Sequence, residues 1–245
     1  HPKEHSMTWS YVLVGFLSAA DALIGSYVFF KNPSRPLNRV FFAFAFGMAL
    51  IGVGMVLLST THHLIFDKVI FAGGYLMVFG LVLLSMKFPA DKPLRPATWL
   101  VFLPLAVLAA LTPFGFLVKE VIFRPDGILQ PVNGPGIHAF VVIIGAYVLL
   151  SGWEFWKRYK SLSGPSRLQM QYLVLGAGVF VLTTFLCDVL LPSLGAFDLN
   201  VLGPISSVVF VVAIAYAIVQ HRLLDIRVVI QRSAIYLALM AVVVG

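Results

Sequence analysis

The chain is poor in charge. Charged residues make up 11% of its 245 residues, while 60% are hydrophobic. A soluble domain is about a quarter charged and about half apolar. A soluble domain of this length needs far more charge than this on its surface. The composition therefore argues against a soluble enzyme or a disordered tail, and predicts an all-α, polytopic membrane protein.

Cysteine is nearly missing as well. The single Cys187 excludes an internal disulfide and a cysteine metal cluster. Because Cys187 lies in an apolar run, we expect a buried thiol. The formal net charge of +7 does not indicate a nucleic-acid partner, since no polar stripe interleaves basic and aromatic residues.

Long apolar runs fill most of the chain. Runs of roughly 17 to 25 apolar residues are typical of membrane-spanning helices. Seven such runs are present: Tyr11–Phe30, Val40–Leu58, Val69–Phe88, Thr98–Val118, Ile137–Trp156, Met170–Leu191 and Pro204–Val219. We expect the longest loop over Pro125–Pro135, where proline and glycine cluster. The seven spans are predicted to form one domain over residues 1–232, since no linker divides them.

A further apolar segment starts near Ser233 and continues to Gly245. It is too short to cross a bilayer. We expect it to be the start of an eighth span that leads to an output domain beyond this segment.

Lysine and arginine are distributed unevenly between the connections. Thirteen of the seventeen basic residues fall in alternate connections, and the other four are Lys3, Lys68, Lys119 and Arg124. Basic residues concentrate on the cytoplasmic side of membrane proteins. The pattern therefore predicts an extracytoplasmic N-terminus. Tryptophans near the predicted span ends fit interfacial anchors: Trp9, Trp99, Trp153 and Trp156.

Asp21 lies near the middle of the first predicted span. A charge there costs about 2.5–3.5 kcal/mol, and apart from Lys87 at the end of the third span no Lys or Arg lies within any span to pair with it. One interpretation is a ligand, ion or proton site. The other is a neutral carboxyl group that ties helices together through Ser18, Ser26 or Tyr75.

Several polar residues are predicted at the extracytoplasmic side. Asp188 and His138 lie near the outer ends of the sixth and fifth spans, and His62, His63 and Asp67 follow the second. One hypothesis is that these residues line an outward-facing pocket for a polar or basic ligand, which enters between the spans that carry Asp21, His138 and Asp188, with Tyr75 as a further candidate ligand-binding residue. The alternative is a polar fringe at the membrane surface. A zinc site at His62 and His63 is disfavoured, because adjacent helical residues diverge and no third ligand is evident.

Other features predict structural roles. Glu154 and Arg158 are four residues apart and are expected to form an ion pair on one helix face. The stretches Ala43–Gly47, Gly73–Gly74 and Gly176–Gly178 contain small residues that allow close helix contact.

Motifs of enzyme chemistry are missing from the sequence. It has no Gly-x-Ser-x-Gly, no His-Glu-x-x-His and no phosphate-binding glycine loop. We therefore predict no catalytic residue, cofactor or metal in this segment. A secondary transporter or ion-coupled carrier that uses Asp21 is the alternative function, although no second mid-membrane acid is evident.

The second half of the chain resembles a known family. The sixth span starts with the polar segment Arg167–Tyr172 and ends in Leu190-Leu191-Pro192, and the seventh starts at Gly203-Pro204. The seventh span leads into the sequence Tyr-Ala-Ile-Val-Gln-His-Arg-Leu-Leu-Asp-Ile over residues 216–226. These features are similar to the N-terminal seven-transmembrane sensor region of bacterial histidine kinases.

The resemblance implies a sensory input domain in the bacterial inner membrane. Such a domain detects a small extracytoplasmic or membrane-borne ligand and relays the signal through its last helices. Its expected partners are the bilayer, a cytoplasmic kinase domain, a response regulator and a second copy of the chain. The residues that match the closing motif are expected to transmit the signal: Tyr216, His221, Arg222 and Asp225.

Overall fold

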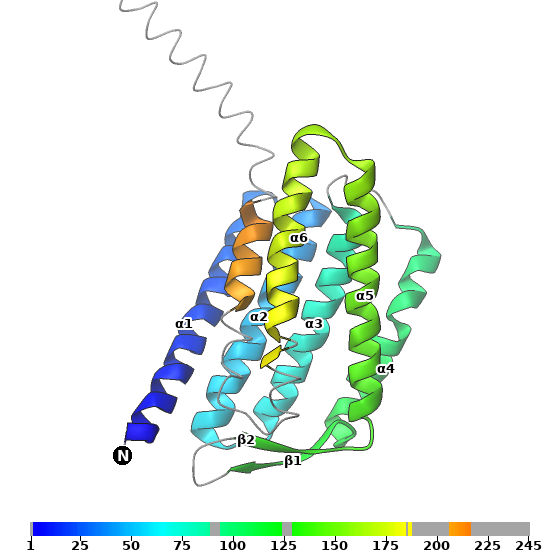
Figure 1. The fold of residues 1–245 in the computed structure, drawn as a ribbon. Coiled ribbons are helices and arrows are strands. Elements are labelled where there is room, and N and C mark those ends of the chain that lie inside the picture. Colours follow the sequence, from blue (N-terminus) through cyan, green and yellow to red (C-terminus); the bar gives the residue numbers. More distant parts are fainter. Residues whose placement is uncertain (1, 89–93, 124–128, 185, 188–205, 217–245) are drawn as a thin grey trace, which may run out of the picture.

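The computed structural model describes residues 2–88, 94–123, 129–184, 186–187 and 206–216. The described helices run mostly along one another in a bundle, with a two-stranded hairpin at one end (Figure 1). The long helices are α1 (Pro2–Lys31), α2 (Pro36–Thr61), α3 (Ile65–Lys87), α5 (Ile137–Ser161) and α6 (Gly164–Thr184). Residues Ser206–Tyr216 form a shorter apolar helix, which we call the 206–216 helix.

Five described helical segments are long and apolar enough to cross a membrane. They are Tyr11–Lys31, Pro36–Thr61, Ile65–Lys87, Pro96–Phe114 and Ile137–Ser161. The first five predicted spans thus correspond to apolar helices of sufficient length. The described parts of the other two are α6 and the 206–216 helix, so seven spans and their orientation stay predictions. The segment from Ser233 lies outside the described residues.

The fourth predicted span ends earlier than the sequence pattern indicates. It consists of a 3-10 helix, η1 (Pro96–Phe102), then α4 (Leu103–Leu111) and a 3-10 turn, η2 (Thr112–Phe114). Gly115 then takes a left-handed conformation with φ of 73°, which ends the helix. The prediction that this span continues to Val118 is therefore wrong.

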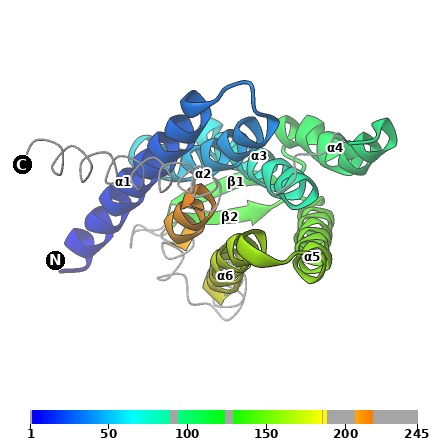
Figure 2. The same cartoon turned by 90° about the horizontal axis from the view of Figure 1, so that it is seen from above.

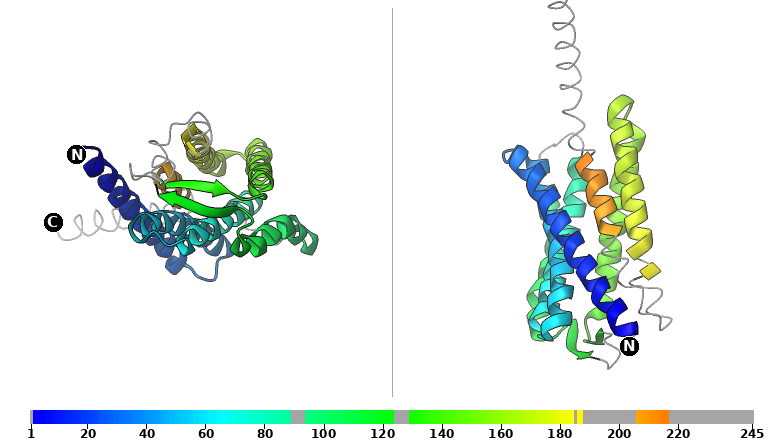
Figure 3. Two further views of the ribbon diagram at one scale, coloured as in Figure 1. Left: turned by 90° about the horizontal axis from the view of Figure 1, so that it is seen from below. Right: turned by 90° about the vertical axis from the view of Figure 1, so that its left-hand side faces the viewer.

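A β-hairpin replaces part of the loop that was predicted after the fourth span. Strand β1 (Val118–Phe123) pairs with β2 (Leu129–Asn133) in antiparallel register, with an irregularity between Val118 and Glu120. The hairpin lies across one end of the bundle, the end at which α1 begins (Figure 3). We call this the hairpin end.

Helices α2 and α3 form a close pair through their glycines. A Cβ atom added at Gly80 would lie 2.8 Å from the Cα atom of Phe44, and one added at Gly47 would lie 2.7 Å from the carbonyl oxygen of Gly73. A Cβ added at Gly74 would meet nothing within 4 Å. The prediction of close helix contact is confirmed at Gly47 and Gly73, and does not hold at Gly74.

The 206–216 helix packs among α1, α2 and α6 (Figure 2). Phe210 is fully buried, with its ring centroid 5.1 Å from that of Phe44 on α2 and 5.6 Å from that of Phe180 on α6. A Cβ added at Gly176 of α6 would lie 2.6 Å from the Cβ of Ala213. Segments far apart in sequence therefore meet in the core around Phe210.

Candidate functional site

Asp21 is buried between α1 and the 206–216 helix. Its side chain is 1% exposed, and the hydroxyl of Ser207 donates a hydrogen bond to its Oδ2 atom at 2.7 Å. The other carboxyl oxygen, Oδ1, has no hydrogen-bond partner among the described residues. A carboxyl group so buried is costly unless it is paired or neutral, so this contact is a polar tie between two distant segments.

The partner of Asp21 differs from the three that the sequence suggested. Ser18 donates its hydroxyl to the carbonyl oxygen of Val14, one helical turn away. The hydroxyl of Tyr75 pairs with Thr112 at 2.5 Å. Ser207 lies 186 residues from Asp21 in the chain, so no local spacing indicates the pair.

The other residues of the predicted ligand pocket lie in separate surroundings. Tyr75 is buried against η2, and its ring contacts Phe140 edge-on, with the centroids 6.1 Å apart. His138 is exposed in the first turn of α5. Asp188 lies outside the described residues. Within the described chain, no hydrogen bond or ring contact joins Asp21, Tyr75 and His138.

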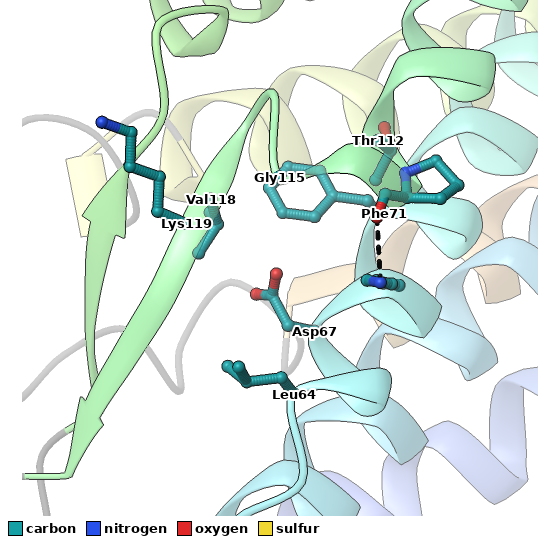
Figure 4. Close-up of a pocket in the computed structure, with 9 residues that line it drawn as sticks. Leu64, Asp67, Phe71, Thr112, Gly115, Val118 and Lys119 are labelled. Carbon is teal, nitrogen blue, oxygen red and sulfur yellow. Dashed lines mark hydrogen bonds between the residues drawn. The ribbon is translucent and has the colours of Figure 1, made fainter.

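A pocket of about 160 Å³ opens at the hairpin end, between the start of α3, η2 and β1. We call it the hairpin pocket. Its walls include Leu64, Asp67, Phe71, Thr112, Pro113 and Val118. The carboxylate of Asp67 points from α3 toward β1, as Figure 4 shows. The sequence placed Asp67 either in an outward-facing pocket or in a polar outer fringe, but did not predict the strand beside it.

Two lysines also line the hairpin pocket. Lys68 donates from its ammonium nitrogen to the carbonyl oxygen of Pro113 at 3.0 Å. Lys119 lies on β1, and its ammonium group points away from Asp67 (Figure 4). Neither lysine forms an ion pair with Asp67 in the described structure. The carboxylate of Asp67 is therefore left with free acceptor positions.

At the opposite end of the bundle, polar side chains donate hydrogen bonds to the carbonyl groups at helix ends. Arg158 of α5 donates from Nη1 to the carbonyl oxygen of Phe88 at 3.2 Å, and from Nη2 to that of Met86. These carbonyls end α3, where they have no partner within their own helix. Glu154 still acts on Arg158 electrostatically, but no contact within 4.0 Å joins the predicted pair in the described residues. Glu154 instead lies 3.9 Å from the Nζ atom of Lys157, because Arg158 reaches across to α3.

The turn between α1 and α2 is fixed at this same end. The buried Asn38 donates from Nδ2 to the carbonyl oxygens of Val28 at 2.8 Å and Asn32 at 3.1 Å. Arg39 donates from Nε to the carbonyl oxygen of Pro33 at 2.7 Å. The first of these bonds satisfies a carbonyl in the last turn of α1, and the other two hold the turn that follows it.

Of the predicted transmission residues, the structure describes Tyr216. Its ring contacts Tyr172 of α6 edge-on, with the centroids 5.5 Å apart, and it is half-exposed. His221, Arg222 and Asp225 lie outside the described residues. They follow Tyr216 in the chain by five to nine residues.

No group of three or more histidine, cysteine, aspartate or glutamate side chains in the described residues is placed to hold a metal ion. Cys187 is a buried free thiol, which confirms its expected state. Trp99, Trp153 and Trp156 are each at least half-exposed, as anchors at a membrane surface are.

A comparison with protein families identifies a match over most of the chain. The family model described as the N-terminal 7TM region of histidine kinase matches residues 13–227. No curated protein matches the chain, and no solved structure matches it. The family match spans all the described helices apart from the first turns of α1.

Proposed function

The chain belongs to the family of N-terminal 7TM regions of histidine kinases, and from this premise we propose that it is the sensory input domain of a histidine kinase. In this proposal it crosses the bacterial cytoplasmic membrane seven times, with its N-terminus outside. It detects a small extracytoplasmic or membrane-borne ligand. The signal passes to a cytoplasmic kinase domain and a response regulator, within a homodimer of the full-length protein.

The distribution of charge supports this orientation. The α1–α2 turn with Lys31 and the ends of α3 and α5 with Arg158 lie at the end opposite the hairpin (Figure 1). Connections at that end hold the basic clusters of the sequence, which the positive-inside rule places in the cytoplasm. The hairpin end and the N-terminus then face outward.

The proposed relay of the signal to the kinase domain rests on one observation, the position of the 206–216 helix. It is held to α1 by the hydrogen bond from Ser207 to Asp21, and to α2 and α6 by Phe210. The chain continues from it toward Asp225 at the predicted cytoplasmic surface. Small shifts of packed helices are a common switching mode, so a movement of this helix is a direct route to the output domain.

The comparisons give no support to the alternative of a secondary transporter. The matching family is that of histidine kinase N-terminal 7TM regions. In the described residues Asp21 has a serine partner from a distant helix, and no second acidic side chain is bonded to it.

Asp225 tests the relay. The full-length kinase is reconstituted in membrane vesicles. We expect Asp225→Asn to make the rate of autophosphorylation independent of the conformation of the membrane domain, while insertion of the protein into the membrane stays intact. The reason is that the resemblance assigns Asp225 to the segment that joins the last span to the output. Autophosphorylation with labelled ATP measures the first effect, and protease accessibility of the loops measures the second.

The matched control is Asp126→Asn, the same substitution in the predicted extracytoplasmic loop. It is expected to leave autophosphorylation unchanged. If Asp225→Asn signals as the wild-type chain does, Asp225 has no part in the relay.

A further inference from the structure

We infer that the hairpin pocket binds a small organic cation, a protonated amine that carries a short apolar chain, through the carboxylate of Asp67. The inference deepens the proposed function, because it names the chemical class of ligand for the sensor. It rests on that function for its biological role, but the binding itself is measurable without any kinase.

The pocket wall holds one carboxyl group, that of Asp67, and two ammonium groups, of which that of Lys68 acts electrostatically on Asp67. The half-buried Asp67 forms no hydrogen bond or ion pair in the described chain. The ammonium group of Lys68 is engaged with the carbonyl oxygen of Pro113, and that of Lys119 points away from Asp67 (Figure 4). An ammonium group that enters the pocket thus meets a carboxylate whose acceptor positions are free. Hydrogen bonds to a charged acceptor are the stronger ones in proteins.

The hydroxyl groups at the pocket are already engaged. The hydroxyl of Thr112 donates to the carbonyl oxygen of Leu108 at 2.8 Å and accepts from Tyr75 at 2.5 Å. Thr112 therefore has no free proton to offer an anionic or neutral acceptor. Recognition in the pocket depends mainly on the carboxylate of Asp67.

The apolar walls determine the size and the polarity of the rest of the ligand. Leu64, Phe71 and Val118 line the pocket beside Asp67. The face of an aromatic ring attracts a cation within about 6 Å, so Phe71 complements the same charge. A volume of about 160 Å³ is small beside the roughly 300–1,000 Å³ of sites for drug-sized ligands. The ligand is therefore limited to a few carbon atoms beyond its amine.

The pocket is in contact with the core of the bundle. Phe71 contacts Phe140 of α5 edge-on, with the ring centroids 5.3 Å apart. Phe140 also contacts Tyr75, which is bonded to Thr112 in the pocket wall. An occupant that displaces Phe71 or Thr112 therefore acts on the packing between α3 and α5.

The test measures binding of n-butylammonium by saturation-transfer NMR. The chain is reconstituted in phosphatidylcholine nanodiscs, and the signal from empty nanodiscs is subtracted. We expect saturable binding of butylammonium, and much weaker binding of 1-butanol and butyrate, which have the same chain without the positive charge. We expect Asp67→Asn to weaken butylammonium binding about tenfold or more. We expect Phe71→Leu to weaken it several-fold, as cation–π attraction indicates.

Glu120→Gln is the control, because it removes an exposed carboxylate from the same hairpin but not from the pocket. It is expected to leave the affinity unchanged. The inference is overturned if the wild-type chain shows no saturable binding, if butyrate or 1-butanol binds equally well, or if Asp67→Asn binds as the wild type does. Each of these outcomes leaves the Asp225 test of the relay unaffected.

Discussion

Helix α2 contacts its two inner neighbours in different ways. Against α3 the backbones touch, since an added Cβ at Gly80 or Gly47 would overlap the facing helix. Against the 206–216 helix the contact is made by side chains, mainly the rings of Phe44 and Phe210. The 206–216 helix is further held by the hydrogen bond from Ser207 to Asp21 and by the close packing of Ala213 against Gly176 of α6.

The difference predicts which part of the bundle would move in the proposed relay. Helices in backbone contact are held by many short contacts and cannot slide without separating. Helices that interdigitate through side chains accommodate small sliding movements by changes of rotamer. The α2–α3 pair is therefore the fixed frame, and the 206–216 helix is the element that we expect to shift.

The largest effect on stability is expected from a side chain placed into the contact between α2 and α3. Gly80→Val puts a branched side chain against the Phe44 backbone, and should lower the free energy of unfolding by about 3 kcal/mol. Unfolding in mixed micelles of sodium dodecyl sulfate measures this change. Gly74→Val on the same helix meets open space and should change it by about 0.5 kcal/mol or less. Equal losses from the two variants would mean that backbone contact does not hold the frame.

The second largest loss of stability is expected at the end of α3, which belongs to the fixed frame. Arg158→Met removes both hydrogen bonds to the last carbonyls of α3 and should cost about 2–3 kcal/mol of unfolding free energy. Lys157→Met is the matched control. Lys157 is exposed, with a single ion pair at 3.9 Å, so its loss should cost about 0.5 kcal/mol or less. If Arg158→Met is as mild as the control, α5 does not brace α3.

The smallest effect is expected where the 206–216 helix ends. Tyr216→Phe keeps the ring that contacts Tyr172 and removes a hydroxyl from a half-exposed side chain. The unfolding free energy should change by about 0.5 kcal/mol or less, as thermal unfolding in detergent would show. A loss comparable to that of Gly80→Val would place this end of the helix in the fixed frame.

Hydropathy was sufficient to predict the first five spans, because a membrane helix needs a long apolar run whatever its neighbours are. It did not predict the hairpin. Strands of five and six residues lie within a loop rich in proline and glycine, and they follow an apolar run that masks the start of β1. Residues such as Val118 suit the end of a span and the start of a strand equally well.

The polar contacts depend on tertiary structure that the sequence does not encode locally. Asp21 was recognised as a costly residue, but its partner Ser207 comes from another helix. Arg158 was assigned to Glu154 by spacing, although α3 offers it two carbonyl oxygens about seventy residues away in the chain. Gly73 and Gly74 look alike in the sequence, and the rotation of α3 alone decides which of them faces α2.

The most direct test of the central claim is the autophosphorylation rate of the full-length kinase carrying Ser207→Ala. If the bond to Asp21 sets the position of the 206–216 helix, its loss shifts the balance of signalling states by about 1–2 kcal/mol, and the rate changes about fivefold or more. The control is Ser85→Ala, since Ser85 is equally buried but donates within its own helix to Val82 at 2.7 Å. We predict a changed rate for Ser207→Ala and an unchanged rate for Ser85→Ala. Wild-type rates in both variants would contradict the account.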